Sequence, residues 1–307
     1  MAEERRVLEA QTQRQLLADM EQAPKQSAFV RARRWALKNP TGAAGLAMLV
    51  LLAAAGIFAD VLATHGVLDY TSAGNLDPSA EHYLGTDSLG RDIYSLLMQG
   101  ARISLSIGVA AVLLGVTGGA VLGLVSAYIG GWFDLLLQRL IDAKIAIPGI
   151  ILSMVILAVL GANVVNLIIA IAIGFIAGSS RIIRSVVLRE KETVYALAAR
   201  SLGASHVRIM FRHLLPNSLA PYFILISVQV GSAIISEASL SFLGLGPGPE
   251  TPSWGQMLSV AARNYFDSTP ALAIAPGLAI TIAVLGFNLF GDAMRDTLDP
   301  RLKGGGR

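Results

Sequence analysis

The sequence contains no cysteine and only four histidines in 307 residues. The lack of thiols excludes disulfide bonds, cysteine nucleophiles and cysteine-based metal centres. The histidines, His65, His82, His206 and His213, are dispersed along the chain, and no His-Glu-x-x-His sequence occurs. His206 and His213 have the spacing of one helix face, but two histidines alone make a poor zinc site. We therefore predict no metal site.

Nucleotide-binding and hydrolytic motifs are also missing. The sequence has no Gly-x-x-x-x-Gly-Lys-Ser/Thr loop to cradle nucleotide phosphates. Gly178-Ser179-Ser180 superficially suggests an intramembrane serine protease, but no apolar span carries a histidine to act as the base. We predict no catalytic residue and no cofactor bound by this chain, so it is not expected to be an enzyme.

Charge is scarce. Charged residues make up 15 % of the chain and apolar residues 54 %, whereas a soluble domain carries about 25 % charged residues. A helix needs about 20 mostly apolar residues to cross a bilayer. The composition predicts an all-α membrane protein with six transmembrane helices. The six apolar runs are residues 43–63, 103–129, 145–160, 164–177, 222–245 and 271–290.

The third and fourth runs are shorter than a full crossing and are separated only by Gly161, Ala162 and Asn163. They form either two spans joined by a tight turn or one re-entrant pair. We favour two spans, because their combined length exceeds one crossing and Gly-Ala-Asn is a turn signal.

Basic residues indicate the orientation. Nearly all Lys and Arg lie in the amino-terminal arm, the 130–144 linker, the 181–213 segment and the tail. Six spans put these segments on one side, which the positive-inside rule assigns to the cytoplasm with both termini. The small excess of basic over acidic residues thus indicates how the chain is oriented in the membrane and does not indicate nucleic-acid binding. The predicted parts are a cytoplasmic arm (1–40), a first transmembrane helix (41–64), an outer loop with an interfacial helix (65–102), a core of five transmembrane helices (103–292, with a cytoplasmic insert at 181–217) and a cytoplasmic tail (293–307).

Residues 191–217 form a polar, basic insert that we predict to be two short helices joined at Gly203. Glycine permits the tight turn, Ser205 is a helix cap, and Pro216 is expected to stop the second helix. Apolar residues repeat along one face of each helix. Either the membrane surface or a partner protein would cover these faces. The residues on the two faces are Val194, Leu197, Ala198 and Leu202, then Val207, Met210, Phe211 and Leu214.

The stretch AARSLGAS, followed by RHLLP, resembles the EAA loop of permeases of ATP-binding cassette importers. Leu197 stands where many members carry the glutamate that names the motif. In that family the loop docks into a groove on a separate ATPase subunit. The resemblance implies an ATPase-coupling role for Tyr195, Ala196, Leu197, Ala198, Ala199, Leu202, Gly203, Ala204, Ser205, Val207, Arg208, Phe211 and Pro216.

The predicted outer loop carries a second motif. Thr86 or Asp87 is expected to cap a helix whose face holds Ile93, Leu96, Leu97 and Gly100, and the plain interpretation is an interfacial helix leading into the second span. The segment also resembles the GTD-x-x-GRD-x-x-S pattern of dipeptide, oligopeptide and nickel permeases. That resemblance implies a role near the outer mouth for Thr86, Asp87, Arg91 and Asp92.

Glu237 lies within the fifth apolar run, in the sequence SEASLSFLGLG. A carboxylate at membrane depth usually faces a bundle interior or an aqueous cavity. Glu237 is therefore either a hydrogen-bonded packing residue or, with Ser236, part of a translocation pathway. Trp254 in the following loop is suited to anchoring at the membrane interface.

The second span carries Gly115, Gly119 and Gly123, which form two overlapping G-x-x-x-G pairs. Small residues at this spacing let helix backbones approach closely. The pattern leaves open whether they pack within this chain or against a partner subunit.

Together the motifs make residues 30–302 similar to the C-type permease subunit of dipeptide and oligopeptide importers. The resemblance implies the type I, MetI-like permease fold with an additional N-terminal helix. It also implies a bacterial inner-membrane location and alternating access. The implied partners are a second, homologous permease, two cytoplasmic ATPase subunits that bind ATP and magnesium, and an extracytoplasmic substrate-binding protein. Alternatives are a nickel or glutathione importer of the same family and, less favoured, a stand-alone channel or secondary transporter.

Overall fold

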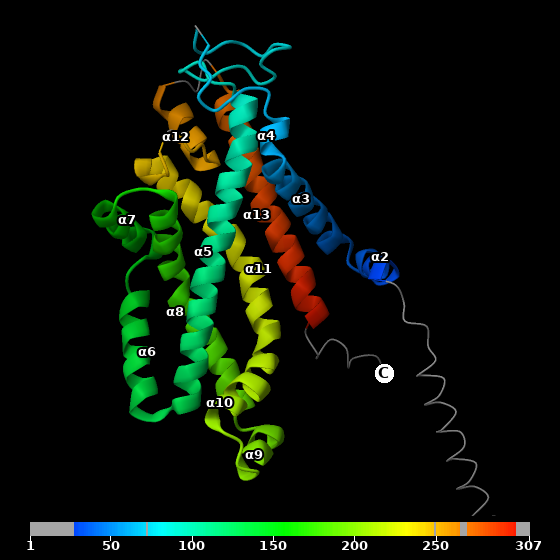
Figure 1. Ribbon diagram of the computed structural model, residues 1–307, viewed down its shortest axis with the longest axis vertical. Coiled ribbons are helices and arrows are strands. Elements are labelled where there is room, and N and C mark those ends of the chain that lie inside the picture. The colour runs from blue at the N-terminus through cyan, green and yellow to red at the C-terminus, as the bar shows by residue number, and fades with distance from the viewer. Residues whose placement is uncertain (1–27, 72, 249, 265–268, 299–307) are drawn as a thin grey trace, which may run out of the picture. The chain divides into compact units, whose positions relative to one another are not determined.

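A computed structural model describes residues 28–71, 73–248, 250–264 and 269–298 (Figure 1). Within these ranges the chain is helical, and the only β-type pairing is an isolated bridge between Thr86 and Asp92. The chain divides into two compact units, Met1–Pro40 and Thr41–Arg307. The described part of the first unit is mainly helix α2 (Ala28–Lys38). Most of the predicted arm, and the predicted tail beyond residue 298, lie outside the described residues.

The second unit is a bundle in which α5, α8, α11 and α13 lie side by side (Figure 1). A loop at residues 63–92 lies at one end of α5, here called the loop end, and α9 and α10 lie at the other, the insert end. The elements in order are α3 (Pro40–Ile57), α4 (Ala59–Leu62), α5 (Ile93–Ile129), α6 (Gly131–Ile145), α7 (Gly149–Leu160), α8 (Val164–Glu190), α9 (Val194–Ser201), α10 (His206–Ile209), the π-helical turn η1 (Met210–Leu214), α11 (Leu215–Leu240), the π-helical turn η2 (Ser241–Leu245), α12 (Trp254–Asn264) and α13 (Ala271–Leu298).

The predicted membrane spans are largely confirmed. Among the described residues, five helices are long and apolar enough to cross a membrane: α3, α5, α8, the run His206–Leu245 and α13. The pair α6 and α7 passes the same test only jointly, with a bend of 87° between its halves, and makes a sixth candidate. The all-α fold with up to six crossings therefore agrees with the prediction.

The predicted bounds of the third span, 145–160 after a linker at 130–144, were wrong. Residues 131–145 are helix α6, and α7 has only 12 residues, a length of about 18 Å against a hydrocarbon core of about 30 Å. Proline disfavours helical geometry at the residue before it and offers no N–H to a continuing helix. Pro148, the N-cap of α7, therefore separates the two helices.

The predicted interfacial helix in the outer loop is also corrected. Helix α5 is continuous over 37 residues, about 55 Å at 1.5 Å per residue, so the segment before residue 103 is the first part of the span's own helix. Its cap is Asp92, which accepts a hydrogen bond from Ser95 N at 2.8 Å. The expected caps Thr86 and Asp87 lie further back in the loop.

The first span is broken at Phe58, between α3 and α4. Arg102 of α5 fixes this break, because its guanidinium donates to Gly56 O (2.9 Å), Ile57 O (3.1 Å) and Asp60 Oδ1 (3.1 Å). The end of the first span is thus attached to the side of α5.

The glycines of α5 pack within the chain. A Cβ added at Gly115, Gly119 or Gly123 would lie 2.3 to 2.4 Å from a backbone carbonyl oxygen of α8. The two backbones therefore touch along a seam that admits no side chain. This observation answers the question that the sequence left open, since α8 of the same chain fills the glycine face.

The core lies toward the loop end, where α5, α11, α12 and α13 meet. Trp254 is 1 % exposed and its Nε1 donates to Leu97 O at 3.1 Å. Its ring packs against Gly100, where a Cβ would lie 2.9 Å from Trp254 Cδ1. The expectation that Trp254 anchors at the membrane interface was wrong, because the loop after η2 folds back into the bundle and buries the ring.

Candidate functional site: the two-helix insert

The insert at residues 191–217 has the predicted two-helix form. Helix α9 ends at Ser201, and Gly203 makes the turn with a φ of +75°, a left-handed conformation that glycine adopts without strain. Ser205 is the N-cap of α10, and its Oγ accepts a hydrogen bond from Arg208 N at 3.4 Å. Local sequence signals were sufficient to place these features.

Pro216 does not stop the second helix, contrary to the prediction. The π-helical turn Met210–Leu214 connects α10 to α11, and the N–H of Leu215 bonds to Met210 O, five residues back. Pro216 lies in the first turn of α11. A proline inside an α-helix removes a hydrogen bond and clashes with the carbonyl four residues earlier. The π turn before Pro216 has hydrogen bonds that span five residues, so the usual bond to the residue four back is not required there. The helical run therefore continues from His206 through α11 into η2, where Gly244 has a non-helical φ of +87° before the run ends at Leu245.

Three buried side chains attach the insert to the bundle. Ala196, Ile209 and Leu214 are 4 %, 4 % and 0 % exposed. They belong to an apolar cluster with the last turns of two spans: Ala120, Leu124 and Ala127 of α5, and Ile183 and Val187 of α8. The sequence did not predict these contacts, because the helical spacing of apolar residues does not show which side of a helix packs against the bundle.

Polar contacts add to this attachment. Lys191 Nζ donates to Ala127 O at 3.0 Å, and the Tyr128 hydroxyl lies 2.8 Å from His206 Nδ1. The Tyr195 hydroxyl donates to Glu190 Oε2 at 3.0 Å and accepts from Asn217 Nδ2 at 3.1 Å. Burial raises the pKa of the Tyr195 phenol, so it keeps its proton at neutral pH for this bond. The insert is thereby held at both of its ends.

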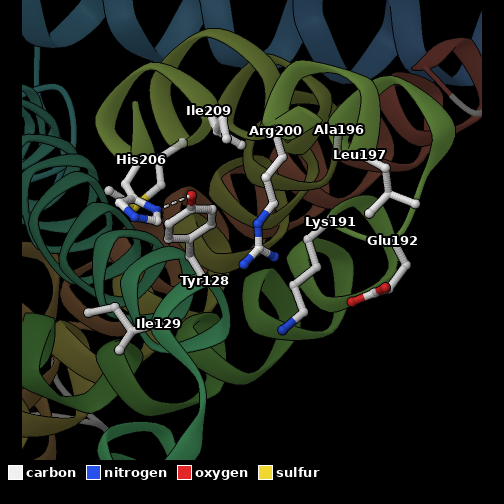
Figure 2. A pocket seen from close by; sticks show the side chains of 10 residues that line it. Tyr128, Ile129, Lys191, Glu192, Ala196, Leu197, Arg200, His206 and Ile209 are labelled. Carbon is white, nitrogen blue, oxygen red and sulfur yellow. Dashed lines mark hydrogen bonds between the residues drawn. The ribbon is translucent and has the colours of Figure 1, made fainter. Parts of the chain in front are cut away.

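A hollow of about 630 Å³ separates the insert from the ends of α5 and α8 (Figure 2). Figure 2 shows the cationic ends of Lys191 and Arg200 extending into it, with the bonded pair Tyr128 and His206 on the opposite side. The hollow is lined by Tyr128, Ile129, Lys191, Glu192, Ala196, Leu197, Arg200, His206, Ile209 and Met210. The insert thus touches the bundle at discrete points and leaves open space beside them.

Most of the remaining large apolar side chains of the insert are exposed. Ala198 is exposed, whereas Ala199 and Ala204 are half-buried against the apolar cluster. The exposed apolar face, as we define it, comprises Val194 (83 % exposed), Leu197 (46 %), Leu202 (88 %), Val207 (62 %) and Phe211 (58 %). Large apolar side chains grouped in this way are typical of an interaction surface.

The predicted outer-mouth residues are brought together at the loop end, far along the chain from the insert. Thr86, Asp87, Arg91 and Asp92 are all buried. Asp87 accepts hydrogen bonds from the backbone N–H groups of Leu89 and Arg91 and from Arg91 Nε, each at 2.8 to 2.9 Å. Thr86 Oγ1 accepts from Leu76 N at 2.9 Å. These contacts fold the loop on itself, and a role at the outer mouth stays a prediction.

The predicted pathway residues lie in α11. Glu237 is fully buried, and its carboxylate accepts hydrogen bonds from Ser104 Oγ (3.0 Å) and Ser241 Oγ (2.7 Å). Ser236 Oγ donates to Ser232 O of its own helix at 2.9 Å. In this conformation Glu237 is a buried, hydrogen-bonded packing residue, which is the first of the two interpretations that the sequence allowed. Its pathway role, and that of Ser236, stays a prediction.

The fold and the insert define the class: a multi-pass α-helical membrane protein. Residues 119–304 match the family described as "Binding-protein-dependent transport system inner membrane component". The match covers more than half of the chain, so the chain belongs to this family, and it is a permease of an ATP-binding cassette importer in the inner membrane.

Similar proteins are found over most of the length. The chain is 43 % identical over 273 residues to the glutathione transport system permease protein GsiD of Pectobacterium atrosepticum, covering 88 % of this chain and 90 % of that protein. It is 43 % identical over 258 residues to GsiD of Escherichia coli O157:H7, covering 83 % and 85 %. It is 40 % identical over 267 residues to the dipeptide transport system permease protein DppC of Alkalihalophilus pseudofirmus, covering 87 % and 88 %.

Proposed function

We propose that this permease carries small peptides across the inner membrane. Its similar proteins are named for dipeptide and glutathione transport, and glutathione is itself a small peptide. These names favour peptides over nickel, the other substrate that the motifs suggested. We identify no group in the described residues that would distinguish one peptide from another. We therefore propose that the extracytoplasmic binding protein, which delivers the substrate, determines which peptide is transported.

We further propose that the insert docks on a separate ATPase subunit. The observation that carries this proposal is the exposed apolar face at Val194, Leu197, Leu202, Val207 and Phe211. Burial of an exposed leucine or phenylalanine against a partner contributes about 1.5 to 3 kcal/mol. The insert is itself anchored by a different set of side chains, so the exposed face is available for binding.

A partner protein fits this face better than lipid does. The last turns of α8 and the residues after it carry Arg189, Glu190, Lys191 and Glu192. Charged residues beside an apolar span mark its exit from the hydrocarbon. Helix α9 follows these charges, so its apolar side chains lie beyond the membrane core. The excess of Lys and Arg in this segment, in the amino-terminal arm and in the tail supports a cytoplasmic location for all three.

The continuous run His206–Leu245 provides the mechanical connection. Because α10, η1 and α11 form one helical body, displacement of the insert by an ATPase displaces a span as well. The ATPases would bind ATP and magnesium, and this chain none. A second permease completes the pathway, which opens alternately to each side. For ATP to bias that equilibrium, its binding must change the contacts at the insert.

The experiment introduces a charge at Leu202, the most exposed residue of the exposed apolar face. In the full complex reconstituted into liposomes, Leu202→Asp is expected to lower peptide uptake and ATPase co-purification roughly tenfold or more, from a loss of about 1.5 to 3 kcal/mol. Leu202→Met keeps an apolar side chain and is expected to retain both. Unchanged uptake and co-purification for Leu202→Asp would contradict docking through this face.

A further inference from the structure

The fold brings together two histidines that the sequence places far apart. His65 and His82 lie in the loop at residues 63–92, with ring centroids 4.6 Å apart. Glu81 lies beside them, and one ligand atom from each of the three residues lies within 4.8 Å of the others. His82 is 4 % exposed, His65 is half-buried and Glu81 is exposed. Two imidazoles and a carboxylate therefore converge at one point of the loop.

Hydrogen bonds fix which nitrogen of His82 is available. Its Nδ1 lies 3.1 Å from Oδ1 of Asp92, a carboxylate that is 2 % exposed. A carboxylate oxygen opposite Nδ1 accepts its proton, and in the neutral ring this leaves the lone pair on Nε2. No described residue donates a hydrogen bond to that Nε2. A histidine held by a carboxylate in this way is the usual arrangement of a metal-ligating imidazole.

His65 is oriented by the same carboxylate through Thr64. Thr64 Oγ1 donates to Asp92 Oδ2 at 3.3 Å and lies 3.0 Å from His65 Nδ1. Thr64 Oγ1 also lies 3.3 Å from Ser95 Oγ. When the threonine proton is on the Asp92 bond, Thr64 Oγ1 accepts from His65 Nδ1, and Nε2 is the nitrogen of His65 left for a ligand. Asp92 thus contacts His82 directly and His65 through Thr64.

We infer that His65, His82 and Glu81 form a binding site for a divalent transition-metal ion of the zinc type. Two neutral imidazoles and one carboxylate are a common zinc ligand set, with a fourth position left for water. The nitrogen ligands disfavour calcium and magnesium, which prefer oxygen, and the absence of sulfur disfavours copper(I).

The site connects the loop to the first turn of α5. Asp92, which orients both histidines, is also the N-cap of α5 through its bond to Ser95 N. The backbone N–H groups of Thr64 and His65 both donate to Ser95 Oγ at 3.0 Å. A bound metal therefore ties the segment after α4 and the segment around residue 82 to the start of the long span.

The test is zinc binding by the purified, chelator-washed complex without nucleotide. Wild type is expected to bind one more zinc ion per complex than His65→Ala or Glu81→Ala, both changed at positions that solvent reaches. His206→Ala, at the insert end, is expected to keep the wild-type number. Equal zinc content in wild type and the two loop variants would overturn the inference, as would loss of zinc from His206→Ala alone.

A second measurement tests the orientation of His65. Thr64→Val removes the oxygen that His65 Nδ1 bonds but leaves all three ligands in place, so zinc affinity is expected to fall roughly 10- to 100-fold. Thr64→Ser restores the hydroxyl and is expected to restore the affinity. Identical zinc affinity for wild type, Thr64→Val and Thr64→Ser would contradict the arrangement described above.

Discussion

Glu237 lies where α5, α11 and α12 meet, and it bonds directly to Ser104 of α5, which in turn bonds to the start of α12. Ser104 of α5 donates to the carboxylate and at the same time accepts the N–H of Trp254, the first residue of α12, at 3.1 Å. Ser241 donates to the other carboxylate oxygen. A buried charged or polar group is costly unless such partners satisfy it. At the residue scale, Glu237 is thus a packing centre of the bundle.

We therefore predict that Glu237→Gln destabilises the complex. The amide has one acceptor oxygen in place of two, so one serine hydroxyl must turn to accept from the new N–H₂ group and give up its present bond. We expect this rearrangement of a buried network to cost about 1 to 3 kcal/mol. Thermal unfolding of the purified complex measures this. Ser239→Ala is the control, because Ser239 Oγ bonds only to Ile235 O of its own helix. Unchanged thermal stability together with lost peptide uptake would favour the pathway role instead.

The prolines show how far a single residue predicts the end or the start of a helix. Pro148 is the N-cap of α7, a position where its missing N–H removes no helical hydrogen bond. The expectation that Pro216 stops a helix failed, because the π turn before it depends on how α10 packs through Ile209 and Leu214. The cap of α5 was missed for a similar reason, since Thr86, Asp87 and Asp92 are all suitable caps and tertiary contacts selected Asp92.

At the scale of elements, the seam between α5 and α8 is the closest helix contact that we find in the described part of the bundle. Gly119 faces Ile176 O, and a Cβ there would lie 2.4 Å from that oxygen and 2.8 Å from Ser179 Cβ. Gly118, its neighbour on the same helix, has no atom closer than 3.8 Å to such a Cβ. Adjacent glycines thus have opposite tolerance for a side chain.

Gly119→Ala is expected to destabilise the permease, because the added methyl forces the two backbones apart, at a cost of about 1 to 3 kcal/mol for overpacking. Gly118→Ala is the matched control and is expected to be neutral or slightly stabilising, since alanine favours helix over glycine. Thermal unfolding and the yield of folded complex measure both. Equal stability of the two variants would mean that the seam is looser than described.

Element boundaries were predicted less well than element existence. Apolar runs located each span, but they could not separate an interfacial segment from the span that continues it in α5, nor show that α8 extends to Glu190 through charged residues. Ion pairs with α6 accompany that extension: Arg184 donates to Asp134 Oδ1 and Oδ2 at 2.8 and 2.6 Å, and Arg181 bonds to Asp142. Such pairing between distant segments is invisible to a local pattern.

At the scale of the whole permease, one helical body links the insert to the bundle core. The run His206–Leu245 begins beside the exposed apolar face and contains Glu237, whose partners hold α5 and α12. Under the docking proposal, a movement of the insert is expected to reach this place through α11, because α10, η1 and α11 follow one another without a break in the chain.

The sequence identified the family and the insert because both are encoded in short, contiguous motifs. It could not identify the meeting of His65 with His82, of Ser104 with Glu237, or of Gly123 with Ser180, because these contacts join segments far apart in the chain. The functional prediction was therefore stronger than the prediction of individual pathway residues, which depends on such long-range contacts.

The central claim is that the exposed apolar face of the insert binds the ATPase in the cytoplasm. The chain has no cysteine, so Leu202→Cys introduces the one thiol of this subunit, to which a photoreactive maleimide can be attached in a complex whose partner subunits have had their reactive cysteines replaced. Val159→Cys in α7, whose native side chain is 78 % exposed, is the control. We predict that irradiation links position 202, and not position 159, to an ATPase subunit. Linkage of position 202 to lipid alone, or its labelling by an impermeant reagent from outside the cell, would contradict the account.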